Sequence, residues 1–256
     1  MFKRGNMNLE EYFRLHRKAA IAFSGGVDSS YLMYAASRFA QEVKAYYVKT
    51  AFQPAFELAD AKRLAASLSV PLKIITLDIL SFDEVAANPA NRCYYCKHHL
   101  FEAIIQAARE DGFDVVMDGT NASDQADDRP GMRALQELSV QSPLRICGLT
   151  KQEIRDRSKE AGLFTWNKPA YACLATRIRT GEKITASMLE ETEKSENFLY
   201  EMGFRDFRVR RCGDTAKIQV CARQLPMFLE NRGAVRAELG KYYKDILLDL
   251  KARDEI

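Results

Sequence analysis

The sequence lacks the features that would place it in a membrane or in an export pathway. It contains no uninterrupted apolar run of about 18 residues, the length that a membrane-spanning helix requires. The first residues, Met1-Phe2-Lys3-Arg4-Gly5-Asn6, lack the apolar core of a signal peptide. There is also no internal repeat and no low-complexity stretch. We therefore expect a cytoplasmic protein without a membrane partner.

The sequence also has a small net charge and few cysteines. The 38 Lys and Arg residues against 35 Asp and Glu give a net charge of +3, which is too small to indicate a nucleic-acid partner. Six cysteines in 256 residues do not form a disulfide framework, so we expect thiols or metal ligands. Three of them, Cys147, Cys212 and Cys221, are predicted to be small apolar fillers.

Strand and helix patterns alternate in the first half of the chain, which is typical of a parallel sheet covered on both faces. The predicted strands are 20–24, 43–49, 72–77 and 115–118, and the predicted helices are 8–17, 29–39, 56–69 and 97–111. A long helix over 185–203, strands over 207–211 and 217–220, and a helix over 224–239 follow. The expected fold class is α/β, with a doubly wound parallel sheet in domain 1–181 and a small α+β substrate or oligomerisation domain in 182–256.

The segment Ser24-Gly25-Gly26-Val27-Asp28-Ser29-Ser30 directly follows an apolar run. Two glycines permit a tight turn, and serine hydroxyls beside amides at a helix N-terminus suit phosphate. The segment lacks the glycine spacing and the lysine of Walker A, and it is not a GxGxxG motif. It resembles the SGGxDS loop of the PP-loop ATP pyrophosphatases, which adenylylate a substrate and release pyrophosphate. Asp28 would orient the loop or a Mg2+ ion, or it would cap the helix.

A polar stretch over residues 120–133 is predicted to form a loop over the site. Its acidic residues Asp124, Asp127 and Asp128 could bind a metal or hold the loop through Arg129. The following Pro130-Gly131 is a turn signal that we expect to end regular structure. Thr150 and Glu153 have the spacing of a capping box, which predicts a helix that runs to about residue 161.

Cys93 and Cys96 form a CxxC motif directly before the N-terminal end of a predicted helix. Cys173 lies in a loop that contains a proline. A CxxC fits a redox pair, half of a zinc site, or simple packing. His98 and His99 follow at once and could supply further zinc ligands. The residues alone leave these alternatives open.

Together, these motifs resemble the LarE family of ATP-dependent sulfur insertases, which act in nickel-pincer nucleotide biosynthesis. The resemblance spans nearly the whole chain and is specific through the order and spacing of its motifs. The motifs are 24–29, 92–97, 118–121, 128–131, 143–144, 148–151, 166–170, 172–174 with Arg177, and 208–210.

This resemblance implies that ATP adenylylates a carboxylate of pyridinium-3,5-biscarboxylic acid mononucleotide, a small-molecule nucleotide substrate, and that sulfur then attacks the activated carbonyl. The family has a sacrificial variant, in which one loop cysteine becomes dehydroalanine, and a variant in which three cysteines hold a 4Fe-4S cluster. The reactive cysteine of the sacrificial pattern aligns with Ala172. The resemblance therefore implies that Cys93, Cys96 and Cys173 are catalytic and hold a 4Fe-4S cluster. Sacrifice of Cys173 is the alternative.

The resemblance also implies the remaining cofactors, ligand residues and partners. ATP and Mg2+ would bind at Ser24, Gly25, Gly26, Ser29 and Ser30 together with Asp28. Arg177, Arg208 and Arg210 match family residues that line the active site, and guanidinium groups suit carboxylates and phosphates. The sulfur would come from sulfide or from another sulfur compound. The resemblance also implies self-association, and the family precedent is a homo-hexamer.

Three details of these assignments stay open. Strand alternation places Arg208 and Arg210 on one face, which could instead be plain solvent. Lys97 would either bind phosphate or lie in solvent at the end of the helix. Cys212 stands where the family often has a histidine, so any acid-base or metal role at that position is in doubt.

Other function classes make different demands on the sequence. A tRNA thiolase of the same superfamily would need a broad basic surface or an RNA-binding module, which the near-neutral charge does not indicate. A non-catalytic nucleotide-binding protein would bind ATP without releasing pyrophosphate. An amide-forming ligase would need ammonia delivery and no clustered cysteines.

Overall fold

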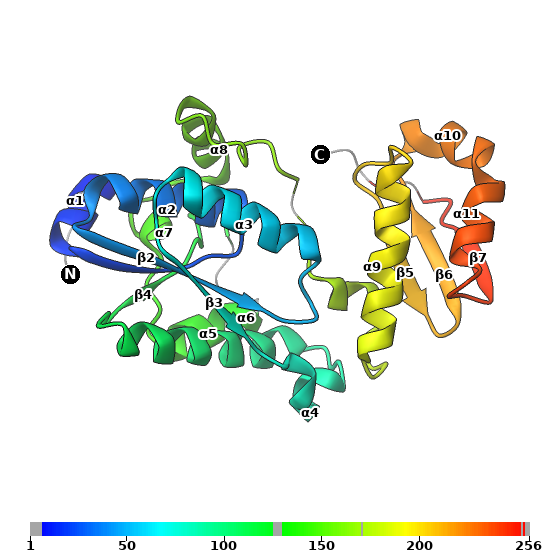
Figure 1. Cartoon of the computed structure of the whole chain (residues 1–256), viewed down its shortest axis with the longest axis horizontal. Coiled ribbons are helices and arrows are strands. Elements are labelled where there is room, and N and C mark those ends of the chain that lie inside the picture. Colours follow the sequence, from blue (N-terminus) through cyan, green and yellow to red (C-terminus); the bar gives the residue numbers. More distant parts are fainter. Residues whose placement is uncertain (1–6, 125–129, 170, 252, 254–256) are drawn as a thin grey trace. The chain divides into compact units, whose positions relative to one another are not determined.

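The computed structural model describes residues 7–124, 130–169, 171–251 and 253 (Figure 1). The chain divides into two compact units: unit 1 is Met1–Ile79 with Asn91–Ala170, and unit 2 is Leu80–Ala90 with Tyr171–Ile256. The division therefore falls earlier than the predicted boundary at residue 181, and unit 2 also includes residues 80–90. Hydrogen bonds from Gly181 N to Asn88 O (2.8 Å) and from Ile184 N to Ala86 O (2.7 Å) join these distant segments.

Unit 1 contains a parallel four-stranded sheet in the order β3-β2-β1-β4, so the predicted α/β class is confirmed. The strands are β1 (Lys18–Ala22), β2 (Glu42–Lys49), β3 (Leu72–Thr76) and β4 (Val116–Met117). Strands β2 and β3 add on one side of β1, whereas β4 pairs with its other side. Ligands in such sheets bind beyond the carboxyl ends of the strands, at the point where the strand order reverses. Here that point is the end of β1.

Helices cover both faces of this sheet because successive strand residues point to opposite sides. Ile21 and Tyr47 pack in one core with α1 (Leu9–Leu15), α2 (Val27–Phe39) and α3 (Ala55–Ser67). Ala20 and Tyr46, their neighbours along the strands, pack in another core with α5 (Arg92–Glu110). Figure 1 shows α2 and α3 on one side of the strands and α5 on the other.

Shorter helices complete unit 1, and one of them corrects a prediction. The helices are α6 (Pro130–Glu137), which contacts α5, α7 (Pro143–Ile146), and α8 (Lys151–Glu160), which contacts α2. Pro130 begins α6 instead of ending regular structure, because a proline costs no hydrogen bond in the first turn of a helix. The predicted capping box is confirmed at the start of α8. Asp127, Asp128 and Arg129 lie outside the described residues.

Unit 2 is a small α+β unit with a three-stranded sheet in the order β5-β6-β7. The strands are β5 (Arg208–Cys212), β6 (Thr215–Gln219) and β7 (Asp245–Leu248), and the helices are α4 (Asp83–Ala86), α9 (Ala186–Glu201), α10 (Leu225–Glu230) and α11 (Arg232–Leu239). Short 3-10 turns lie at η1 (Ile79–Ser81), which begins in unit 1, η2 (Leu174–Arg177) and η3 (Ala222–Gln224). The helix predicted over 224–239 is thus divided, and β7 was not predicted.

The three cysteines predicted as apolar fillers have different environments. Cys221 is fully buried, and Cys147 is half-buried against the core that contains α1 and α2. Cys212 is exposed at the end of β5, so that prediction is wrong for this residue. Among the residues described, no helix has both the length and the apolar character needed to cross a bilayer.

Candidate functional site

The turn between β1 and α2 leaves the N-terminus of α2 open. Gly25 has a φ of +76°, a conformation that favours glycine. Gly26 is the N-cap residue of α2, and no side chain of the described residues accepts a hydrogen bond as its cap. Amides in the first turn of an uncapped helix can donate to an anion, and the helix dipole favours negative charge there. The local geometry therefore suits a phosphate group.

Serine hydroxyls hold this loop in shape from within. Ser29 Oγ lies 3.0 Å from Ser24 Oγ, and Ser30 Oγ donates to Gly26 O at 2.7 Å. Ser29 and Ser30 are buried, whereas Ser24 is exposed. Of the predicted nucleotide-binding serines, Ser24 is thus the one open to a ligand in this structure, and the other two fix the turn.

Asp28 has one paired and one orphaned carboxylate oxygen. Its Oδ2 accepts a hydrogen bond from Lys151 Nζ at 2.6 Å, whereas Oδ1 is buried without a hydrogen-bond partner among the described residues. Burial raises the pKa of Asp28, and the Lys151 ammonium opposes that rise. An orphaned carboxylate oxygen beside a phosphate site fits Mg2+, a hard cation that takes oxygen ligands. The alternative in which Asp28 caps α2 is wrong, because Gly26 is the N-cap residue.

Two lysines contact the loop from separate segments. Lys151 is the first residue of α8, and its backbone N–H donates to Ser123 Oγ at 3.0 Å. Lys168 Nζ donates to Gly25 O at 3.2 Å and to Asp60 Oδ2 at 2.8 Å. Sequence reasoning assigned no role to either lysine, although both lie within the motifs that carry the family resemblance.

The segment Asp118-Gly119-Thr120-Asn121 follows β4 and lies against the start of α2. A Cβ atom at Gly119 would sit 2.7 Å from Ser29 N, which is closer than backbone atoms tolerate. Asp118 accepts hydrogen bonds from Ser142 Oγ at 2.6 Å and from the Thr120 hydroxyl. The two strand ends lie side by side, since β1 and β4 are paired neighbours.

The CxxC motif lies inside the first turns of α5 instead of ahead of the helix. Cys93 is exposed and Cys96 is partly exposed. Arg92 Nη2 lies 3.8 Å from Cys93 Sγ, and its guanidinium carbon lies 5.9 Å from the centre of the Phe52 ring. Residues three apart share one face of a helix, so both thiols lie on the same side of α5.

The neighbours of the CxxC motif have contacts of their own. A Cβ atom at Gly131 would sit 2.8 Å from Lys97 Cδ, so the stem of Lys97 runs against α6. His98 and His99 face Glu102, with nitrogen–oxygen distances of 3.3 and 3.6 Å. Within the described part of the chain, no three His, Cys, Asp or Glu side chains form a group that could hold a metal ion. Among these residues, therefore, neither a zinc ion nor the three-cysteine cluster has an assembled ligand set.

Cys173 belongs to unit 2 and is partly exposed. It is the N-cap residue of η2, and its carbonyl accepts from Thr176 N at 2.9 Å and from Thr176 Oγ1 at 2.8 Å. Arg177 Nη1 donates to Ala172 O at 2.7 Å. The backbone on both sides of the Cys173 thiol is thus fixed by hydrogen bonds.

Glu196 of α9 is the buried centre of a hydrogen-bonded network behind this turn. Its carboxylate accepts from Arg177 Nε (2.8 Å) and Arg177 Nη2 (3.1 Å), and from Tyr171 Oη at 2.6 Å. Val209 N of β5 donates to the same carboxylate at 3.0 Å. Arg177 has only 1% of its surface exposed, so in this structure it positions the turn at Cys173.

Arg208 and Arg210 lie beside this network on β5. The Arg208 guanidinium lies 5.5 Å from the centre of the Tyr171 ring, and Arg210 Nη1 donates to Thr176 O at 2.9 Å. Burial lowers the pKa of both arginines, and the positive charges of Arg177 and Arg253 add to that effect. Neighbouring positive charges repel one another, so this part of unit 2 favours an anionic ligand.

Comparison with known proteins connects these features to a family. A family model described as queuosine biosynthesis protein QueC matches residues 18–90. The chain is 34% identical to the uncharacterised protein slr1717 of Synechocystis sp., over 88% of this chain and 84% of that protein. It is 32% identical to the uncharacterised protein MJ0830 of Methanocaldococcus jannaschii, over 83% of this chain and 81% of that protein.

A further relative has a named activity. The chain is 29% identical to the pyridinium-3,5-bisthiocarboxylic acid mononucleotide synthase of Lactiplantibacillus plantarum, over 91% of this chain and 86% of that protein. The fold of unit 1, its uncapped glycine turn at the end of β1, and these similarities agree with one another. The chain belongs to the family of PP-loop proteins that includes slr1717 and MJ0830.

Proposed function

We propose that this protein is an ATP-dependent sulfur insertase that converts a carboxylate of pyridinium-3,5-biscarboxylic acid mononucleotide into a thiocarboxylate. The observation that carries the proposal is the start of α2, which no side chain of the described residues caps, with Asp28 Oδ1 buried beside it and without a hydrogen-bond partner among those residues. Similarity to the Lactiplantibacillus plantarum synthase supports the choice of substrate.

In the proposed first step, a substrate carboxylate oxygen attacks the α-phosphorus of ATP, and the bond to pyrophosphate breaks. The amides at the start of α2 and the exposed Ser24 hydroxyl would bind the leaving pyrophosphate. Asp28 Oδ1 would bind Mg2+, which neutralises phosphate charge when bound. The product is a mixed anhydride, whose carbonyl has AMP as a good leaving group.

The substrate carries two carboxylates and a phosphate, and it needs cationic recognition. Arg208 and Arg210 would supply it, because guanidinium groups bind carboxylates and phosphates through paired hydrogen bonds. Lys97 is a further candidate for phosphate. Arg177 keeps a different role in this proposal: it holds the Cys173 turn against Glu196.

In the second step, sulfur attacks the activated carbonyl, and AMP leaves. We propose that Cys93, Cys96 and Cys173 hold a 4Fe-4S cluster, which would carry the transferable sulfide. Cys93 and Cys96 lie on one face of α5 and would supply two of the three thiolates. Sulfide or another donor would renew the sulfur, so the protein thiolates would stay intact.

Two further properties belong to the proposal. We propose that the protein works in the cytoplasm, where thiols stay reduced. We also propose that it self-associates, with a hexamer as the first state to test by light scattering.

The test combines product analysis with iron analysis of anaerobically purified protein. ATP with substrate should yield AMP and pyrophosphate, and ATP alone should not. About four irons per chain, lost when Cys93, Cys96 or Cys173 is replaced by Ala, would support the cluster. Cys212→Ala is the matched control, because Cys212 is exposed and outside the proposed ligand set.

Other outcomes would support the competing functions. Dehydroalanine at position 173 after turnover, with no iron bound, would support sacrifice of Cys173. Turnover that requires tRNA in place of the mononucleotide would support a tRNA thiolase. ATP binding without any pyrophosphate release would indicate a non-catalytic nucleotide-binding protein.

A further inference from the structure

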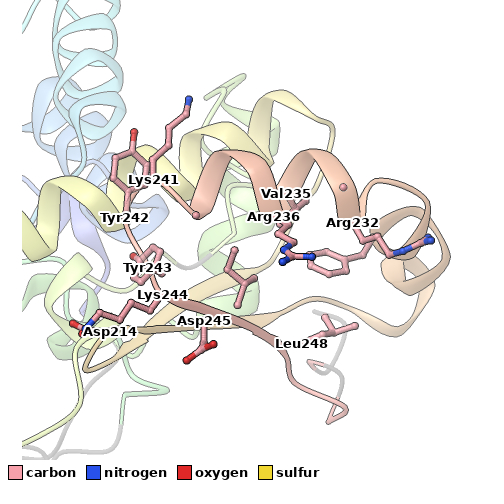
Figure 2. A pocket seen from close by; sticks show the side chains of 14 residues that line it. Asp214, Arg232, Val235, Arg236, Lys241, Tyr242, Tyr243, Lys244, Asp245 and Leu248 are labelled. Atoms are coloured by element: carbon pink, nitrogen blue, oxygen red, sulfur yellow. The ribbon is translucent and has the colours of Figure 1, made fainter.

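Unit 2 contains a cavity that the proposed function does not use. It is open to solvent on one side, has a volume of about 890 Å³, and is formed by α10, α11, β7 and the turn that joins β5 to β6 (Figure 2). Small-molecule sites typically have volumes of about 300 to 1,000 Å³. None of the residues assigned above to nucleotide, substrate or sulfur lines it. The cavity therefore has the size of a ligand site and has no ligand assigned to it.

Apolar side chains line part of the cavity. Phe228 and Val235 are buried members of the core of unit 2, and Tyr243 is buried beside them. The half-buried Tyr242, Ile246 and Leu248 provide the apolar surface that stays open to a ligand. Contact with these side chains would remove the apolar part of a ligand from water, which stabilises a complex by about 25 cal/mol per Å² buried.

Four cations line the cavity, and two of them form ion pairs. Lys244 Nζ lies 2.5 Å from Asp214 Oδ2, and Lys241 Nζ lies 2.5 Å from Glu238 Oε2. Figure 2 shows the Lys244 and Asp214 side chains together at one end, with Arg236 and Arg232 toward the other.

Two arginines lie toward the other end. Arg232 and Arg236 are one turn apart on α11, and neither has an ion pair with a carboxylate of the described residues. Arg232 Nη1 donates to the backbone at Leu229 O (3.0 Å). The lining as a whole has four cations against two carboxylates, Asp214 and Asp245, so the cavity favours an anion.

We propose that this cavity binds a small organic phosphate that has an aromatic or other apolar part. The phosphate contacts Arg236 and Arg232, and the apolar part packs on Ile246 and Leu248. Arginine suits phosphate because its planar fork donates two hydrogen bonds at once. The apolar surface of Ile246 and Leu248 distinguishes such a ligand from inorganic phosphate, and the arginine pair distinguishes it from an uncharged ring.

The test is titration calorimetry of the full chain with phenyl phosphate, in the absence of ATP. Phenyl phosphate should bind more tightly than either inorganic phosphate or phenol, and its affinity should fall as salt is added. Replacing both Arg232 and Arg236 by Ala should weaken binding about tenfold or more, since hydrogen bonds to charged groups are the strong ones. Lys194→Ala, which removes an exposed cation from α9, is the control and should bind normally.

Gly233 allows a second, independent test. It lines the cavity, and a Cβ atom there meets nothing within 4 Å. Gly233→Trp should therefore fill the cavity and abolish phenyl phosphate binding, whereas Gly233→Ala should keep it. Circular dichroism of the two variants would verify that both are folded.

Three results would overturn the proposal: no binding of phenyl phosphate to the wild-type chain, equal binding by the arginine variant, or equal binding by Gly233→Trp. If Gly233→Trp instead disrupts self-association while the wild type binds no phenyl phosphate, the cavity is an interface between copies of the chain. Because the titration contains no ATP, its outcome is independent of whether the protein releases pyrophosphate.

Discussion

Arg177 and Glu196 form a buried ion pair with two contacts, Nε to Oε1 at 2.8 Å and Nη2 to Oε2 at 3.1 Å. Arg177 also donates to Ala172 O, one residue before Cys173. The pair therefore links α9 to the turn that presents the Cys173 thiol, and the position of that thiol depends on a carboxylate that is 23 residues away in the sequence.

Loss of this pair should destabilise the protein. Glu196→Gln would leave the Arg177 charge buried without its counterion, which we expect to lower the free energy of unfolding by about 3 kcal/mol. Urea denaturation followed by circular dichroism measures the change. Glu190→Gln, in the exposed Glu190–Lys194 pair of the same helix, is the control and should have almost no effect. Equal stability of the two variants would contradict the role of the Arg177–Glu196 pair.

Asp28 should be required for adenylylation but not for binding iron. Asp28→Ala removes the orphaned oxygen proposed to bind Mg2+, so we expect ATP-dependent release of pyrophosphate to fall at least about a hundredfold, as for loss of a charge-stabilising group. Iron content should remain that of the wild type. Retained pyrophosphate release would refute this role.

The pKa of Asp28 also predicts a pH dependence of stability. Burial raises this pKa above its ordinary value of 3.8, so the folded state holds the proton at pH values where the unfolded state has lost it. The contribution of Asp28 to stability therefore falls as pH rises from 3.8 through the folded-state pKa. Asp28→Asn cannot titrate, and its stability relative to the wild type should rise over that window.

Asp249 is a control, because its contribution to stability should have the opposite pH dependence. Hydrogen bonds from Gln219 and Lys217 lower the pKa of Asp249 to about 2, so its stabilising contribution is present above 3.8 and is lost as pH falls toward 2. Asp249→Asn should therefore lose stability relative to the wild type as pH rises. Urea denaturation across this pH range measures the stability of each variant relative to the wild type. If the free energy of unfolding of Asp28→Asn has the same pH dependence as that of the wild type, the raised pKa of Asp28 is disproved.

Gly119 should tolerate no side chain. In Gly119→Ala the new Cβ would meet Ser29 N at 2.7 Å, so the start of α2 must shift. We expect a loss of stability of about 1 to 3 kcal/mol, together with weaker ATP binding. Gly233→Ala is the matched control, because its Cβ meets nothing within 4 Å and alanine favours a helix. Normal ATP affinity in Gly119→Ala would argue against close packing of this segment on the loop.

Arg208 should contribute to substrate binding more than to ATP binding. Arg208→Ala removes a guanidinium proposed to contact a substrate anion, so we expect substrate affinity to fall at least about tenfold. Arg205→Ala, whose guanidinium donates to the backbone at Tyr200 and Phe204, is the control. Equal losses of ATP and substrate affinity in titration calorimetry would contradict the assignment.

The parts of this site that were predictable from sequence depend on local chemistry. The glycine turn and the helix after it follow from a few adjacent residues, since glycine alone adopts a φ of +76° readily. The sheet was predictable because buried parallel strands are short apolar runs between helices. The capping box at Thr150 was predictable for the same local reason.

The parts that were not predictable depend on contacts between distant residues. Lys151 reaches Asp28 across 123 residues of sequence, and no local pattern encodes that pair. Arginine is usually exposed, so the burial of Arg177 could be known only once Glu196 was placed behind it. β7 is short and half-buried at an edge of its sheet, so its hydrophobic signal is weak.

The central claim is that the loop between β1 and α2 supports adenylylation. The most direct measurement incubates ATP and pyridinium-3,5-biscarboxylic acid mononucleotide with the wild-type protein and quantifies the nucleotide and phosphate products. The account predicts AMP and pyrophosphate in equal amounts, dependent on the mononucleotide and absent in Asp28→Ala. Formation of ADP and phosphate, or AMP release that does not depend on the mononucleotide, would contradict it.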